Sequence, residues 1–253
     1  MIGPGVRRLL AVILPLVMFV GCATSNEPQY ASSPRKASQI NAQLGANYLQ
    51  AGQLERANSK LRKALDQDSE NVDAHTAFAL LNVRLGKPDE ARRHFETALD
   101  LDPESPQIHN NYGTFLCGQG QHDDGIEQFL KAADNRLYDT PAYAYANAGR
   151  CARAADRDDE ARGYFRQALE LNPRLPSALF QSSELALEAG LPRVAAEYFS
   201  RYSEVAQQGP ETLWLGVRIE RALDDPDGAK EYGLQLLRRF RDPEQAQQFL
   251  ETR

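Results

Sequence analysis

From Ser38 onward, similar segments recur along the chain at a period close to 34 residues. In each copy a small residue is followed four places later by a large apolar residue, and three places after that by alanine. The pattern falls at Ala57, Leu61 and Ala64, at Ala91, Phe95 and Ala98, and at Ala161, Phe165 and Ala168. Such offsets lie on one face of a helix, and small residues allow a neighbouring helix to approach closely. The chain is therefore predicted to form a row of similar helical units.

This pattern resembles the tetratricopeptide repeat (TPR), a helical hairpin with the same period. The resemblance implies an all-α fold, a right-handed superhelix of about six helix-turn-helix units whose first helices line a concave groove. About three units already make a stable stack. The predicted TPR domain covers residues 38–253 and ends in a capping helix from Pro243. Its units are about 38–71, 72–105, 106–139, 142–175, 176–209 and 210–243.

The third and fifth units, like the sixth with its irregular turn at 224–228, depart from the repeat pattern. In the third unit Leu137 stands where proline would close the repeat, and two extra residues precede the fourth unit. In the fifth unit Ser183 replaces the glycine of the first helix.

The first 21 residues do not belong to the repeats. Arg7 and Arg8 precede a twelve-residue apolar run, which is too short to span a membrane and is typical of a secretory signal. The sequence Phe19-Val20-Gly21-Cys22 resembles the lipobox of bacterial lipoproteins, which are cleaved just before the cysteine. The resemblance implies that residues 1–21 are a signal peptide and that Cys22 carries diacylglycerol and an N-linked acyl chain. The alternative is an ordinary cleaved signal with an incidental cysteine.

The segment after the signal is polar. Residues 22–37 contain two prolines and show no apolar period, so the lipidated cysteine is predicted to be followed by a flexible tether. By resemblance to other lipoproteins, Ala23 after the cysteine implies delivery by the lipoprotein sorting machinery to the outer membrane. The protein would then be lipid-anchored and face the periplasm.

Charge and motifs exclude several function classes. Loss of residues 1–21 removes two positive charges and changes the formal net charge from −6 to −8, whereas nucleic-acid binders normally have a basic excess. The chain contains no Gly-rich phosphate loop, no Gly-x-Ser-x-Gly elbow and no His-Glu-x-x-His. We therefore expect no enzyme, no cofactor and no nucleic-acid partner. We also expect no metal site, because the four histidines are interpreted as scattered over different units: His75, His94, His109 and His122.

Cys117 and Cys151 lie 34 residues apart, on the first helices of adjacent units. An oxidising compartment would permit a disulfide between them. Packed helices lie roughly 8–10 Å apart, however, whereas a disulfide requires Cα atoms within about 7 Å. The spacing therefore favours two small buried thiols and leaves a bridge as the alternative.

The helical period also predicts which side chains line the groove. A mixture of apolar, amide and few charged groups suits a peptide or strand with some apolar side chains. The alternative for each residue is a solvated face without a partner. The predicted partner-binding residues are Thr76, Leu80, Asn110, Thr114, Tyr143, Arg150, Phe180 and Glu184.

Four segments are more distinctive than the generic repeat. They are Asn110–Cys117, Thr140–Gly149, Leu213–Arg221 and Leu236–Phe240. They closely resemble the type IV pilus biogenesis lipoproteins of the PilF/PilW family, over essentially the whole chain. The resemblance implies a pilotin, an outer-membrane lipoprotein that binds pilus secretin subunits and promotes their outer-membrane localisation and multimerisation. Pilus biogenesis and twitching motility would depend on it. The alternative is a general TPR adaptor lipoprotein for outer-membrane protein assembly.

Overall fold

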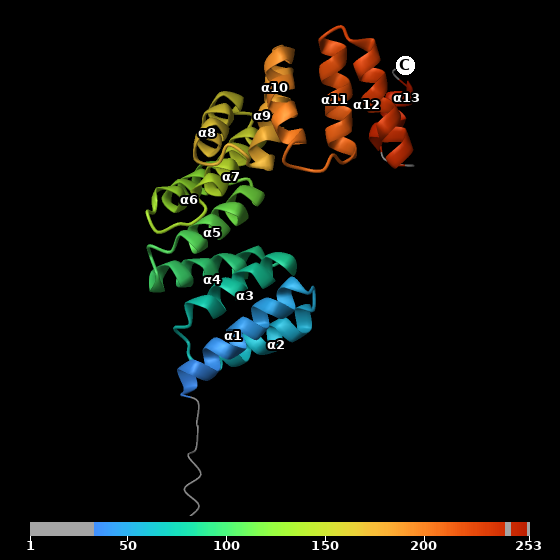
Figure 1. Cartoon of the computed structure of the whole chain (residues 1–253). Coiled ribbons are helices and arrows are strands. Elements are labelled where there is room, and N and C mark those ends of the chain that lie inside the picture. Colours follow the sequence, from blue (N-terminus) through green and yellow to red (C-terminus); the bar gives the residue numbers. More distant parts are fainter. Residues whose placement is uncertain (1–32, 241–243, 252–253) are drawn as a thin grey trace, which may run out of the picture.

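The computed structural model describes residues 33–240 and 244–251. Within these ranges the chain forms thirteen α-helices and no strand, which confirms the predicted all-α repeat fold. Six helix pairs follow one another in a curved row, and a single helix closes it (Figure 1). The predicted signal peptide, Cys22 and most of the predicted tether lie outside the described residues. The helices are α1 (Pro34–Gln50), α2 (Leu54–Gln67), α3 (Val72–Arg84), α4 (Pro88–Leu101), α5 (Pro106–Gly118), α6 (His122–Asp134), α7 (Pro141–Ala154), α8 (Asp158–Leu171), α9 (Pro176–Glu188), α10 (Pro192–Ser203), α11 (Pro210–Ala222), α12 (Pro226–Arg239) and α13 (Glu244–Glu251).

The first helix begins earlier than the predicted repeat domain. The sequence places the start of the repeats at residue 38, whereas α1 begins at Pro34. Proline is favoured in the first turn of a helix, and the Ser33 side chain accepts a hydrogen bond from the backbone N–H of Lys36 at 3.3 Å. The last four residues assigned to the tether are therefore helical.

The turn inside a pair needs a residue that tolerates the left-handed conformation. Gly86 (φ 68°) and Gly120 (φ 78°) supply it after α3 and α5, where glycine has no β-carbon to clash. In the fourth pair Asp156 takes this place with φ 57°. Aspartate adopts this conformation more readily than most residues, so that pair closes in the same way without glycine.

A spacing of sixteen residues organises the core of four of the six described pairs. A glycine of the first helix lies against a large side chain of the second, as Gly149 does against Phe165. A β-carbon at Gly149 would lie 2.7 Å from that ring, so only glycine permits the observed approach. The same relation joins Gly45 to Leu61, Gly113 to Phe129 and Gly216 to Tyr232.

The fifth pair uses serine in place of this glycine. Ser183 is fully buried, and its hydroxyl donates a hydrogen bond to the backbone carbonyl of Ala195 on α10 at 2.8 Å. A buried hydroxyl is tolerated when it is hydrogen-bonded. The departure from the pattern at Ser183 therefore keeps the helices close.

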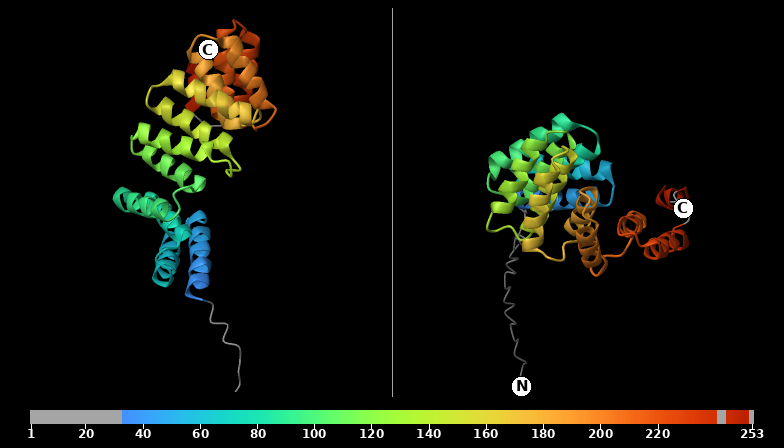
Figure 2. Two further views of the ribbon diagram at one scale, coloured as in Figure 1. Left: turned by 90° about the vertical axis from the view of Figure 1, so that its left-hand side faces the viewer. Right: turned by 90° about the horizontal axis from the view of Figure 1, so that it is seen from above.

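The pairs stack so that their first helices form an inner row. Each of α1, α3, α5, α7 and α9 contacts the next first helix of the row, whereas no two of the second helices (α2, α4, α6, α8, α10 and α12) have Cα atoms within 8 Å of each other in the described ranges. A row in which only one set of helices meets must curve toward that set. The stack in Figure 2 is curved accordingly, and we call the exposed side of the first helices the inner face.

A disulfide links the third and fourth pairs. Cys117 of α5 and Cys151 of α7 are bonded, with Cα atoms 5.8 Å apart, so the preference for two separate thiols was wrong. That estimate compared axis spacing with a limit on Cα atoms. Because Cα atoms lie about 2.3 Å from a helix axis, facing Cα atoms of helices 10 Å apart approach to within disulfide range.

The last pair joins the stack through α11 and is covered by α13. A segment of six residues, 204–209, connects α10 to α11, and α11 contacts both α9 and α10. Helix α13 packs on α11 and α12, where Phe249 and Ala246 are buried, as expected of a cap. No helix in the described part of the chain is both long and apolar enough to cross a membrane.

Candidate functional site

The predicted partner-binding residues all lie on inner-row helices. They occur in twos on successive first helices: Thr76 and Leu80 on α3, Asn110 and Thr114 on α5, Tyr143 and Arg150 on α7, and Phe180 and Glu184 on α9. The repeat stacks these helices side by side, so the eight residues are distributed along one face rather than gathered at a point. Such a face suits an extended ligand more than a small molecule.

The eight predicted residues differ in how much of each side chain is exposed and so accessible to a ligand. Tyr143 is 50% exposed, and Thr114 and Arg150 are also exposed. Leu80 is half-buried against two core clusters, and Phe180 is half-buried with its ring 5.9 Å from that of Tyr202. Leu80 and Phe180 therefore hold the stack together as well as presenting apolar surface.

A polar chain joins α5 to α7 on the inner face. The Asn147 side-chain amide donates to Asn110 Oδ1 at 2.9 Å, and Arg150 donates to Asn147 Oδ1 at 3.1 Å. The Thr114 hydroxyl is engaged locally, donating to the carbonyl of Asn110 at 3.0 Å. These bonds orient the Asn110 amide. Sequence reasoning did not find Asn147.

Arg153 makes the corresponding connection from α7 to α9. Its guanidinium donates to Glu184 at 2.8 Å, to Gln181 at 2.9 Å and to Glu188 at 2.6 Å. The side chains of Arg153 and Glu184 are only 24% and 20% exposed, so this network is stronger than an open surface pair. Glu184 is thus committed to an internal ion pair. In the sequence, Arg153 is followed about one repeat later by the oppositely charged Glu184 and Glu188, and this spacing was the signal for the network.

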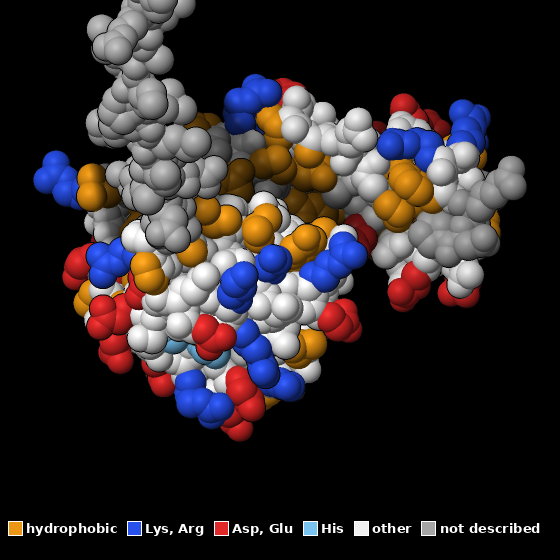
Figure 3. All heavy atoms as spheres, turned by 90° about the horizontal axis from the view of Figure 1, so that it is seen from below, with side chains coloured by type: hydrophobic (Ala, Val, Ile, Leu, Met, Phe, Trp, Pro, Cys, Tyr) orange, Lys and Arg blue, Asp and Glu red, His pale blue; other side chains and the backbone are white. Residues whose placement is uncertain are grey.

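The inner face also has an acidic end. A hollow of about 580 Å³ opens beside the beginnings of α1, α3 and α5. Thr76 lines it together with Asp68, Asp73 and Asp102, while Arg35 pairs with Asp68 at 3.5 Å. At the other end, hydrophobic side chains gather in a recess beside the C-terminal helices (Figure 3). A ligand along this surface would meet acidic and apolar regions in turn.

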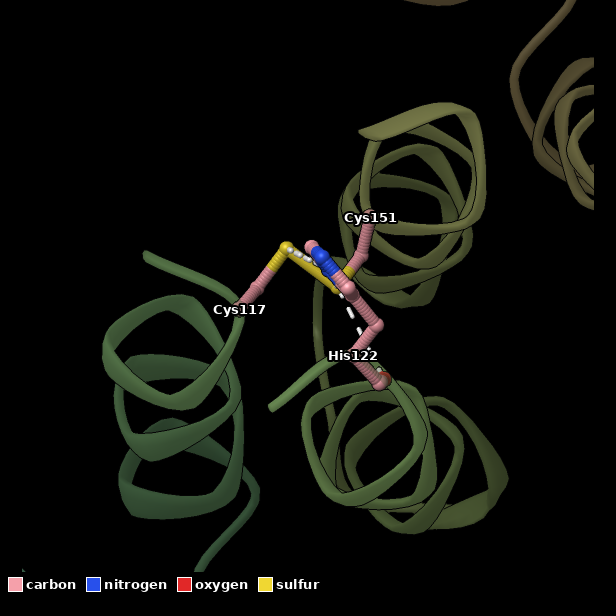
Figure 4. Close-up of side chains that lie close together, drawn as sticks. All are labelled: Cys117, His122 and Cys151. Carbon is pink, nitrogen blue, oxygen red and sulfur yellow. Dashed lines mark hydrogen bonds between the residues drawn. A yellow bond between two sulfur atoms is a disulfide. The ribbon is translucent and has the colours of Figure 1, made fainter. Parts of the chain in front are cut away.

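Two groups of side chains contradict the expectation that the histidines are scattered. His75 and His94 face each other with their Nδ1 atoms 3.0 Å apart, and the His94 ring stacks on Phe78. Burial, then the proximity of His75, lowers the pKa of His94 to about 4. His122 lies beside the disulfide sulfurs of Cys117 and Cys151 (Figure 4). That expectation was wrong because α3 and α4 bring His75 and His94 together within one pair, and the stacking of the third and fourth pairs brings His122 beside Cys151.

Comparison with known proteins agrees with this architecture. Tetratricopeptide repeat models match residues 48–94 and 104–174. The type IV pilus assembly protein PilF of Pseudomonas aeruginosa is 30% identical over 245 residues, which cover 96% of this chain and 97% of PilF. An uncharacterised protein of Haemophilus influenzae is 32% identical over 166 residues, 65% of this chain and 88% of its own length.

Solved structures give the same result. The structure of Pseudomonas aeruginosa PilF superposes with a TM-score of 0.78 at 30% identity, covering 87% of this chain and 99% of the solved PilF chain. PilW, a widely conserved type IV pilus biogenesis factor, superposes with a TM-score of 0.77 at 32% identity, covering 84% and 98%.

The repeat stack and its inner face define a tetratricopeptide repeat protein, a class of scaffolds that mediate protein–protein interactions. Similarity to PilF over nearly the full length then identifies the family within this class. The chain belongs to the PilF/PilW family of type IV pilus biogenesis proteins.

Proposed function

We propose that this chain is a pilotin of the type IV pilus, an outer-membrane lipoprotein that binds secretin subunits through its inner face. In this role it promotes secretin localisation and multimerisation in the outer membrane. The observation that carries the proposal is similarity to PilF over 96% of the chain, which includes the N-terminal lipobox segment as well as the repeats. The protein acts as a scaffold and performs no catalysis.

The inner face supports binding of a protein segment. Its first helices present Tyr143 and Arg150 to solvent, and the oriented Asn110 amide lies beside them. An extended segment could pack an apolar side chain on the Tyr143 ring while its backbone bonds to the amide. Aromatic rings and arginines contribute strongly to interface energy.

The lipid on Cys22 would supply both the sorting signal and the membrane anchor. Several acyl chains on one residue exceed what stable membrane attachment requires. Recognition by the sorting machinery would carry the chain to the outer membrane, with its cargo. Anchoring then raises the effective concentration of bound secretin at the bilayer, without any new contact.

Replacement of the anchor tests the proposal. Cys22→Ala should leave the helical fold intact, release the protein from the outer-membrane fraction, and reduce assembled secretin there. Ser25→Ala, in the same segment, serves as the matched control and should behave as the parent. Secretin multimers at normal levels in the outer membrane of the Cys22→Ala strain would contradict the anchor-driven mechanism.

The phenotype of a deletion separates this function from a general role in outer-membrane protein assembly. Loss of the pilotin should abolish surface pili and leave other outer-membrane proteins at parental levels. Broad depletion of outer-membrane proteins would instead indicate the general adaptor.

A further inference from the structure

Three potential metal ligands converge where α5, α6 and α7 meet. Cys117 lies near the end of α5, His122 is the first residue of α6, and Cys151 lies on α7. The His122 Nδ1 atom is 3.8 Å from the Cys117 sulfur and 3.7 Å from the Cys151 sulfur. All three ligand atoms lie within 4.8 Å of one another, and the imidazole is directed at the sulfur pair (Figure 4).

These separations are close to those of a tetrahedral zinc centre. Zn–S bonds of about 2.3 Å and Zn–N bonds of about 2.0 Å at tetrahedral angles place nitrogen about 3.5 Å from each sulfur, and the sulfurs about 3.8 Å apart. The nitrogen of His122 already stands near that distance from both sulfurs. Only the sulfur atoms, which are bonded to each other in this structure, would have to separate.

The surroundings favour thiolates and allow an ion to enter. Cys151 is fully buried, while Cys117 and His122 are half-buried. The site lies at the N-terminal end of α6, a helix of 13 residues, whose partial positive charge stabilises thiolate. The Cys151 sulfur is 3.7 Å from the backbone carbonyl of His122, so α6 itself closes one side.

We propose that the reduced chain binds Zn²⁺, or another thiolate-preferring metal ion, through Cys117, His122 and Cys151, with a fourth position open to water. A dithiol reductant supplies two electrons and two protons to the disulfide, giving two thiols, and itself becomes a cyclic disulfide. Zn²⁺ then displaces both thiol protons and accepts the lone pair of neutral His122 Nδ1. The disulfide in the oxidised chain and the metal in the reduced chain each cross-link α5 to α7, and the metal also joins α6 to them.

Cobalt spectroscopy on the reduced full-length chain tests the site. The background is Cys22→Ser, so that Cys117 and Cys151 are the only thiols. Co²⁺ added after reduction should give thiolate-to-cobalt charge transfer and the strong visible bands of a tetrahedral ion. Zn²⁺ should bleach them, and the binding of each zinc ion should release about two protons. The oxidised chain should give no such spectrum.

Variants then assign the ligands. His122→Ala should weaken zinc binding at least about tenfold, and Cys117→Ser should abolish the charge-transfer band. His94→Gln, which changes a histidine outside the cluster, should bind as the parent. Circular dichroism of the reduced, metal-free chain shows whether the helices persist; if they do not, Zn²⁺ should restore them. Absence of the cobalt spectrum, failure of Zn²⁺ to restore lost helicity, or parental affinity in His122→Ala would each overturn the proposal.

Discussion

The close approach of α5 and α6 depends on two glycines that touch across the pair. A β-carbon at Gly113 would lie 2.8 Å from the backbone oxygen of Gly125 and 3.0 Å from the Phe129 ring. The backbone oxygen belongs to a helix and cannot rotate away as a flexible side chain can. Gly113→Ala must therefore push the two helices apart.

Two opposing contributions set the change in the free energy of unfolding caused by Gly113→Ala. Alanine is better than glycine inside a helix by about 1 kcal/mol, whereas overpacking a close-packed contact costs about 1–3 kcal/mol. Gly113→Ala should therefore lower the free energy of unfolding by up to about 2 kcal/mol. Gly163 provides the matched control, because it is inside α8 and a β-carbon there meets nothing within 4 Å. Gly163→Ala should stabilise the chain by up to about 1 kcal/mol.

Urea unfolding followed by circular dichroism measures both variants. Repeat arrays need not unfold in one step, so hydrogen exchange in α5 and α6 should accompany it and show faster local opening in Gly113→Ala. If Gly113→Ala stabilised the protein as much as Gly163→Ala, the contact between Gly113 and Gly125 could not control the helix approach.

Three further perturbations test the packing, the pH response and the cross-link. Phe165→Ala removes a fully buried ring and should lower the free energy of unfolding in urea by about 3–5 kcal/mol. Leu137→Ala changes an 87% exposed side chain and should alter that free energy by less than about 0.5 kcal/mol. Equal effects of the two variants would contradict the assigned core. Because the pKa of His94 is about 4 in the folded chain against 6.5 ordinarily, the unfolded chain binds more protons between these values, so stability should fall as pH drops from 6.5 to 4. His94→Gln should flatten this part of a pH–stability curve, and an unchanged slope would exclude His94 as its source. Reduction of the disulfide between Cys117 and Cys151, which closes a loop of 34 residues, should lower thermal stability in the absence of metal by about 3–4 kcal/mol, and insensitivity to reductant would contradict a stabilising cross-link.

Repetition made the fold predictable from the sequence. The spacing of Ala161, Phe165 and Ala168 indicates which face of a helix is buried, and its recurrence predicts a row of helical repeats, which the structure confirms. Local signals then sharpen the helix ends, as Pro34 does for α1. Packing of this kind depends on residue size at regular intervals, which a single sequence records directly.

The site was predictable only in outline. The helical period places Tyr143 and Glu184 on first helices, but the ion pair of Glu184 with Arg153 depends on how α7 and α9 are displaced along each other. The contact of His122 with Cys151 likewise depends on the separation of neighbouring helices at one point. Such distances arise from the packing of whole pairs, and sequence spacing does not record them.

The claim that the inner face binds secretin can be tested by site-specific photo-crosslinking in cells. A photoreactive phenylalanine analogue replaces either Tyr143 on inner helix α7 or Leu171 at the end of second helix α8, which are 50% and 55% exposed. The account predicts an adduct with secretin from position 143 and none from position 171. An adduct from position 171 alone would place the interface on the second helices and contradict binding at the inner face.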